Sequence, residues 1–252
     1  MFAHITVTAQ SLLIVIRKGL SMRSRLPLRL AAAAFALAVT AGSAAAHQVW
    51  IEQEGGKASF YFGEFADNLR EVSPGLLDRI PSLEPKLQGA GGMTALKATK
   101  GADSFVLDGT AGAGESLIAA VTSYPAFERK KDDKTIRTIW TPAARFVTDL
   151  EMRQASLTLD VVPIGLNRAG EAEFQVTYKG APLAKAEVEI VAQSGWVQTR
   201  KTEDDGIFSI VLPWQGSYVI EAKHTDNAAG KRGDEAYDAA MFVTSLSFTL
   251  PE

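Results

Sequence analysis

The stretch YKGAPLAKAEVEIVAQSGWVQTRKTEDDGIFSIVLPWQGSY, residues 178–218, decides the fold. Short runs of aliphatic, β-branched and aromatic residues alternate there with turns that contain Gly, Pro or Asp, around Gly180, at residues 204–206 and at residues 213–216. Runs of this length between such turns are typical of the strands of an antiparallel β-sandwich. The stretch therefore predicts an all-β module.

The same pattern continues on both sides of this stretch. We expect strands at residues 157–162, 171–178, 186–192, 197–201, 207–212, 217–222 and 242–250. Seven short strands at this spacing predict a Greek-key, immunoglobulin-like sandwich that covers residues 156–252.

A second β-rich module is predicted at residues 47–155. Residues 48–52 and 58–62 form a hairpin pattern around the turn at residues 54–57. The segment 68–80 contains Pro and Gly and is interpreted as a loop or helical turn, and the charged segment 127–134 as a solvated loop. Further strands are expected at residues 93–99, 104–107, 116–123 and 135–140. The chain is thus predicted to be an all-β, two-module β-sandwich protein, with its modules joined near residue 155.

Residues 1–46 have the pattern of a leader with a cleaved signal peptide. A basic start at residues 22–26 precedes the apolar run 30–39, and small residues follow up to Ala46. The segment before Met22 is either an over-extended start or a longer basic region. Cleavage after Ala46 makes His47 the first mature residue, although cleavage before Ala46 also satisfies the small-residue rule. The apolar run is too short to span a bilayer, so we expect an exported, periplasmic protein that does not cross the membrane.

Composition narrows the function classes. Removing residues 1–46 takes away five basic residues and no acid, which leaves 21 basic against 29 acidic side chains and a net charge near −8. Nucleic acid is therefore not an expected partner. The chain contains no Cys, which excludes disulfides, thiolate metal sites and thiol catalysis.

The predicted mature chain contains two histidines, His47 and His224. A free α-amino group at His47 and its own Nδ1 can close a chelate ring on one metal ion, and a nitrogen of His224 would complete a histidine brace. Nitrogen-rich sites of this kind suit Cu(II) or Ni(II). The ordinary alternatives are an accidental cleavage junction and an exposed polar residue at a strand end.

Oxygen ligands could complete such a site. The candidates are Glu64, which follows an aromatic run, Asp226 beside His224, and Tyr237 or Asp238. The sequence does not indicate which of them would bind the metal. Each can equally be an ordinary surface residue of an acidic protein.

Four segments together resemble a bacterial family of unknown function that is labelled as a periplasmic, NikM-like nickel/cobalt-uptake component. They are HQVWIE at 47–52, YFGE at 61–64, LTLDVVP at 157–163, and the module that ends on AKH at 222–224. This sequence has Asp160 where the family usually has Glu, and Asn167-Arg168 where Asn-Pro is common. The turns of the C-terminal module also resemble the carboxypeptidase-regulatory-like, transthyretin-related sandwich.

The resemblance implies metal binding or delivery, with His47 and His224 as the matching positions. We therefore expect a non-catalytic periplasmic protein that binds copper or nickel/cobalt and acts in metal uptake or homeostasis. A metal-uptake transporter or an outer-membrane receptor is the partner to look for. The alternatives are a structural or interaction module of the cell envelope and a copper-dependent polysaccharide oxygenase. Glycosidase chemistry needs two carboxylates that flank a cleft, and the sequence identifies no such pair.

Overall fold

The structure is a computed structural model that describes residues 47–251. These residues form β-strands and one 3-10 turn, η1 (Leu76–Arg79), and contain no α-helix, so the all-β prediction is confirmed. Within this range no helical segment has the length and apolar character needed to span a bilayer. The predicted leader, residues 1–46, lies outside the described residues.

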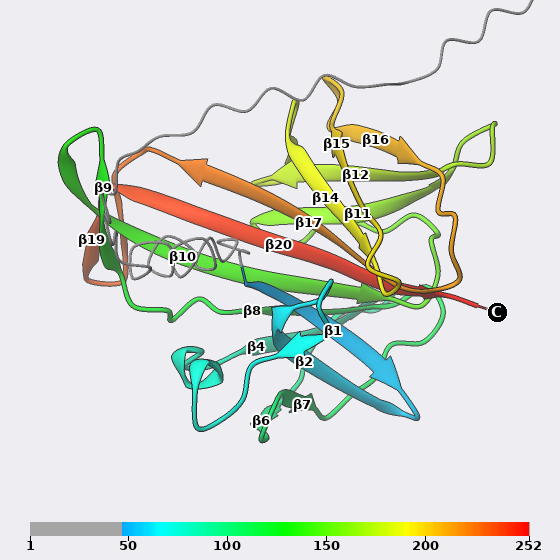
Figure 1. Ribbon diagram of the computed structural model, residues 1–252, viewed down its shortest axis with the longest axis horizontal. Helices are drawn as coiled ribbons and strands as arrows, with labels where there is room; N and C mark the ends of the chain where they lie inside the picture. Colours follow the sequence, from blue (N-terminus) through cyan, green and yellow to red (C-terminus); the bar gives the residue numbers. More distant parts are fainter. Residues whose placement is uncertain (1–46, 252) are drawn as a thin grey trace, which may run out of the picture. The chain divides into compact units, whose positions relative to one another are not determined.

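A nine-stranded sheet forms the centre of the fold (Figure 1). Its long strands β10, β20 and β17 lie side by side, and β20 pairs with β10 in parallel. Its order is β15 (Val197–Lys201), β14 (Glu187–Ala192), β17 (Gly216–Asp226), β20 (Ala239–Leu250), β10 (Lys134–Val147), β8 (Ser116–Ala120), β4 (Glu84–Gly89) and β5 (Gly92–Ala95), with β9 (Phe127–Lys131) paired to β10.

Two smaller sheets cover opposite faces of the central sheet. One contains β1 (Gln48–Glu54), β2 (Lys57–Glu64), β7 (Phe105–Leu107), β6 (Ala98–Lys100) and β3 (Leu69–Arg70). The other contains β11 (Leu159–Leu166), β12 (Ala172–Tyr178), β13 (Ala181–Pro182) and β16 (Ile207–Ile210). A separate ribbon pairs β18 (Gly230–Arg232) with β19 (Glu235–Tyr237).

Side-chain alternation along β20 explains this layering. Leu246 and Phe248 pack into the hydrophobic core shared with β11 and β12. Ser245 and Ser247 point to the other face, where their hydroxyls donate to carbonyls of β1. Because successive residues of a strand face opposite sides, one strand serves both layers. The central sheet therefore has a core on each face.

The two predicted modules have separate main cores, but they share one sheet and a small buried cluster in which Trp50 and Phe65 pack with Val191 and Val219. Residues 49–146 supply the core beneath β1 and β2, whereas residues 147–248 supply the core beneath β11 and β12. However, the parallel pairing of β10 with β20 crosses the expected boundary at residue 155. That pairing joins segments about a hundred residues apart, which local sequence patterns do not reveal.

The charged segment 127–134 differs from the solvated loop that was predicted. It forms the hairpin of β9 and β10, in which Lys131 lies opposite Lys134. Asp132 and Asp133 both have positive φ, 47° and 62°, as the two central residues of a type I′ turn require. The Asp-Asp pair therefore makes a turn, and the charges on both sides lie on exposed strands.

Candidate functional site

His47 lies directly before β1, and β1 is firmly attached to the central sheet. The Ser245 hydroxyl donates to the Val49 carbonyl, and the Ser247 hydroxyl donates to the Ile51 carbonyl at 2.5 Å. Trp50, which follows Val49 in β1, is fully buried and packs with Val191 and Val219 of the central sheet. The backbone that carries His47 is thus held by hydrogen bonds and by packing.

The His47 side chain contacts Glu71. Nε2 of His47 lies 2.6 Å from Oε1 of Glu71, and the two side chains are 31% and 15% exposed. Glu71 is itself positioned by β2, because its backbone N–H donates to the Phe62 carbonyl at 2.8 Å. The His47 ring also lies 5.0 Å from the Phe62 ring. These contacts fix Nε2 and leave Nδ1 outside the pair.

An apolar pocket of about 350 Å³ adjoins His47. Phe62, Tyr124, Trp140 and Met241 contribute to its wall. The Tyr124 and Trp140 rings meet edge to face at 4.9 Å, so the aromatic part of the wall is packed on itself.

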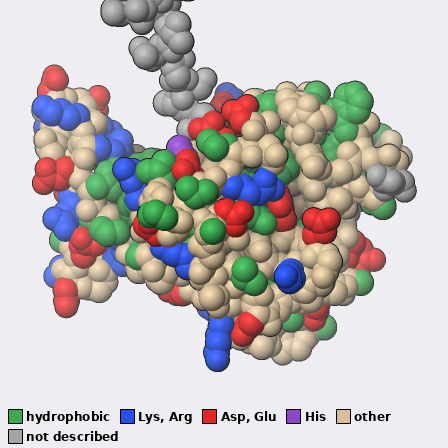
Figure 2. All heavy atoms as spheres, turned by 60° about the horizontal axis from the view of Figure 1, so that its bottom comes forward, with side chains coloured by type: hydrophobic (Ala, Val, Ile, Leu, Met, Phe, Trp, Pro, Cys, Tyr) green, Lys and Arg blue, Asp and Glu red, His purple; other side chains and the backbone are tan. Residues whose placement is uncertain are grey.

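One cationic side chain, the exposed Arg79 of η1, also lines this pocket. Acidic and basic side chains mix with hydrophobic ones over the face of the molecule shown in Figure 2. No single sign of charge dominates that face.

His224 lies in a different environment. It is on β17 opposite Phe242, and its ring lies 4.2 Å from the Tyr178 ring of β12. Burial lowers its pKa. Asp226 accepts hydrogen bonds from the Tyr178 hydroxyl at 2.8 Å and from Lys179 Nζ at 3.0 Å, and its bonds to the Ala228 N–H and to these two side chains lower its pKa.

The structure places the two histidines on opposite faces of the central sheet. Along β17, His224 continues the row of Ile220 and Ala222, which face the core beneath β11 and β12. His47 instead borders the pocket that Met241 also lines. Met241 directly precedes Phe242 on β20, so the two side chains face opposite sides of the central sheet. The brace of His47 with His224 is therefore not assembled in this arrangement, because a sheet lies between them.

Two of the predicted oxygen ligands, Glu64 and Asp226, also lie apart, one near each histidine. The register that pairs Gln48 with Gly63 brings Glu64 alongside the position of His47, whereas Asp226 lies with His224. The Asp238 carboxylate accepts a hydrogen bond from the Arg137 backbone N–H at 2.8 Å, and Tyr237 is the last residue of β19. Within residues 47–251, no three His, Asp or Glu side chains gather as a preformed metal site.

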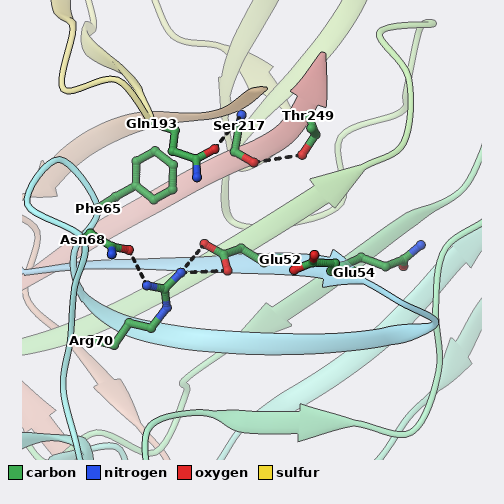
Figure 3. Close-up of a pocket in the computed structure, with 9 residues that line it drawn as sticks. Glu52, Glu54, Phe65, Asn68, Arg70, Gln193, Ser217 and Thr249 are labelled. Atoms are coloured by element: carbon green, nitrogen blue, oxygen red, sulfur yellow. Dashed lines mark hydrogen bonds and ion pairs between the residues drawn. The ribbon is translucent and has the colours of Figure 1, made fainter. Parts of the chain in front are cut away.

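A second pocket, of about 540 Å³, is polar (Figure 3). Glu52 accepts two hydrogen bonds from Arg70, both at 2.9 Å, and a third from Trp50 Nε1 at 2.8 Å. Across the pocket, the Ser217 and Thr249 hydroxyls bond to each other at 3.0 Å. These polar side chains form hydrogen bonds and an ion pair with one another, which is typical of a structural network.

Sequence reasoning missed Glu71, which contacts His47, and Met241, which lines the same pocket as His47. Glu71 belongs to a segment interpreted only as a polar loop, and its role depends on the fold of β2 and β3. Met241 lies in a strand predicted to begin at residue 242. No local pattern in the sequence indicates either contact.

A search of curated proteins finds no match to this chain. The family described as Domain of unknown function (DUF4198) matches residues 44–226, which include β1, both histidines and most of the strands of the central sheet. Because the match covers well over half of the chain, the protein belongs to this family.

Proposed function

We propose that the mature protein binds a transition-metal ion through the α-amino group and Nδ1 of His47. The contact of His47 Nε2 with Glu71 at 2.6 Å carries this proposal. A carboxylate that accepts the Nε2 hydrogen fixes the imidazole tautomer and leaves the lone pair on Nδ1. A carboxylate behind a metal-binding histidine is a recurrent arrangement, and it also raises the basicity of the ligand.

The surroundings of His47 favour binding at this position. A flexible N-terminus would lose conformational freedom on chelation, whereas β1 is already held by Ser245 and Ser247. The half-exposed ring remains accessible to an incoming ion. We do not include His224, since its ring packs on Tyr178 across the sheet.

The bound metal is interpreted as cargo rather than as the centre of a reaction. The NikM-like resemblance supports a role in periplasmic metal uptake or homeostasis, with a transporter or an outer-membrane receptor as partner. The C-terminal module, which resembles the carboxypeptidase-regulatory-like sandwich, would then be the support that holds β1 in place.

The test begins with N-terminal sequencing of the exported protein, which we expect to start at His47. Cu(II) and Ni(II) titrations would then compare the wild type with His47→Ala and, as a matched control, His224→Ala. We expect His47→Ala to lose high-affinity binding and His224→Ala to retain it. Equal binding by all three forms would refute the proposed site and favour a structural module of the cell envelope.

A further inference from the structure

We propose that Met241 supplies a thioether ligand that makes the His47 site a Cu(I) site. This inference rests on the proposed function, and it names the metal and its oxidation state. Met241 lies on β20, directly opposite Trp140 in the parallel register with β10. Its side chain is half-buried and lines the same pocket as His47.

The placement of Met241 differs from that of the other methionines in the described residues. Met93 is 46% exposed and Met152 is 72% exposed, and neither lines this pocket. Met241 therefore combines three properties: partial burial, apolar neighbours and a place in the wall of the pocket that His47 also lines. Met93 and Met152 lie at the surface, whereas the Met241 side chain forms part of the pocket wall.

Ligand chemistry favours Cu(I) over Ni(II). Thioether sulfur is a soft donor that selects Cu(I), while imidazole serves several transition metals. The rest of the wall is mainly aromatic, with Phe62, Tyr124 and Trp140 contributing carbon atoms. Placing charge in such surroundings is costly, and the cost is smaller for a monovalent than for a divalent ion.

Charged groups of both signs border the site, since Glu64 lies alongside His47 and Arg232 donates to the carbonyls of Tyr124 and Trp140. Arg79 lines the pocket and repels a cation, but its exposure to solvent screens that repulsion. Glu71 contacts His47 and contributes a compensating negative charge on the other side of the imidazole. These opposing charges leave the soft thioether donor, rather than net charge, as the feature that favours Cu(I).

The absence of cysteine from the sequence makes the proposal directly measurable. Any sulfur atom bound to copper in this protein must come from methionine. We expect X-ray absorption of the Cu(I)-loaded mature protein to show one sulfur scatterer. That signal should disappear in Met241→Leu and persist in the matched control Met152→Leu.

Affinity measurements complete the test. Under anaerobic, reducing conditions, competition with a chromogenic Cu(I) chelator should show that Met241→Leu weakens Cu(I) binding by at least about tenfold. Its Cu(II) and Ni(II) affinities, measured without reductant, should remain within about threefold of wild type. Met152→Leu should leave all three affinities unchanged.

The two proposals fail in different ways. If Met241→Leu retains both the sulfur signal and the Cu(I) affinity while His47→Ala loses metal binding, the thioether proposal is overturned and the His47 site stands. If His47→Ala binds every ion as the wild type does, the His47 site itself is overturned.

Discussion

Replacing Asp160 with Asn should strongly destabilise the protein, because Asp160 balances a fully buried arginine. Asp160 of β11 and Arg145 of β10 are both completely buried. Two hydrogen bonds join them, from Arg145 Nε to Oδ1 at 3.0 Å and from Nη2 to Oδ2 at 2.6 Å. The backbone N–H groups of Ser156 and Leu157 also donate to Oδ2. Asp160 thus ties the central sheet to the sheet that contains β11.

The size of the effect follows from this burial. Removing one partner of a buried pair leaves a desolvated charge and costs about 3–5 kcal/mol. For a body of this length, each kcal/mol lowers Tm by about 2–4 °C, so Asp160→Asn should lower Tm by about 6–20 °C. Thermal unfolding followed by circular dichroism measures this shift.

A surface pair provides the matched control. Arg137 and Glu235 lie 2.7 Å apart but are half-exposed, so Glu235→Gln should cost at most about 1 kcal/mol. The double variant Arg145→Met/Asp160→Leu should recover only part of the lost stability, because no unpaired charge remains but the Ser156 and Leu157 N–H groups lose their acceptor. A Tm shift for Asp160→Asn no larger than that of Glu235→Gln would refute the reasoning.

Three further results are expected. Glu71→Gln should weaken Cu(II) binding about 10–100-fold in an isothermal titration, because it removes the carboxylate behind His47; an unchanged affinity would show that the pair is only structural. Glu221 is buried with one oxygen unpartnered among the described residues, and burial raises its pKa to about 7 despite an ion pair with Lys223. The folded state therefore binds its proton more tightly than the unfolded state does, and the free energy of unfolding should fall by at most about 3 kcal/mol between pH 4.5 and 7. Denaturant titrations should show that Glu221→Gln removes this slope, and a slope unchanged in the variant would contradict the assignment. Trp140 lines the proposed copper pocket, so copper should quench tryptophan fluorescence in the wild type and much less in Trp140→Phe; equal quenching would place the ion elsewhere.

The C-terminal strands could be predicted because their turns are encoded locally. Gly206 in the turn after β15 has φ of 75°, and a Cβ at this position would lie 2.6 Å from the Val176 carbonyl oxygen. Glycine is required there for both conformation and space. The neighbouring Asp205 caps the same turn by accepting from the Ile207 N–H at 3.0 Å. Such short-range signals set the strand ends without knowledge of the whole fold.

The arrangement of the candidate site could not be predicted in the same way. Alternation places His224 on the side of Ile220, but the sequence does not tell which layer covers that side. The answer depends on the parallel pairing of β10 and β20, a long-range contact. Glu71 reaches His47 only because its backbone bonds to Phe62. These contacts arise from tertiary structure, whereas the brace was predicted only from the number of histidines and the expected N-terminal position of His47.

The most direct test of the central claim compares the Cu(II) affinity of the mature protein with that of its Nα-acetylated form. Acetylation removes the donor lone pair of the α-amino group while leaving the His47 side chain, Glu71 and the pocket in place. Because the two nitrogens of a chelate act as linked donors, we expect affinity to fall by at least about a hundredfold. Affinities that agree within about twofold would contradict the chelate and with it the proposed function.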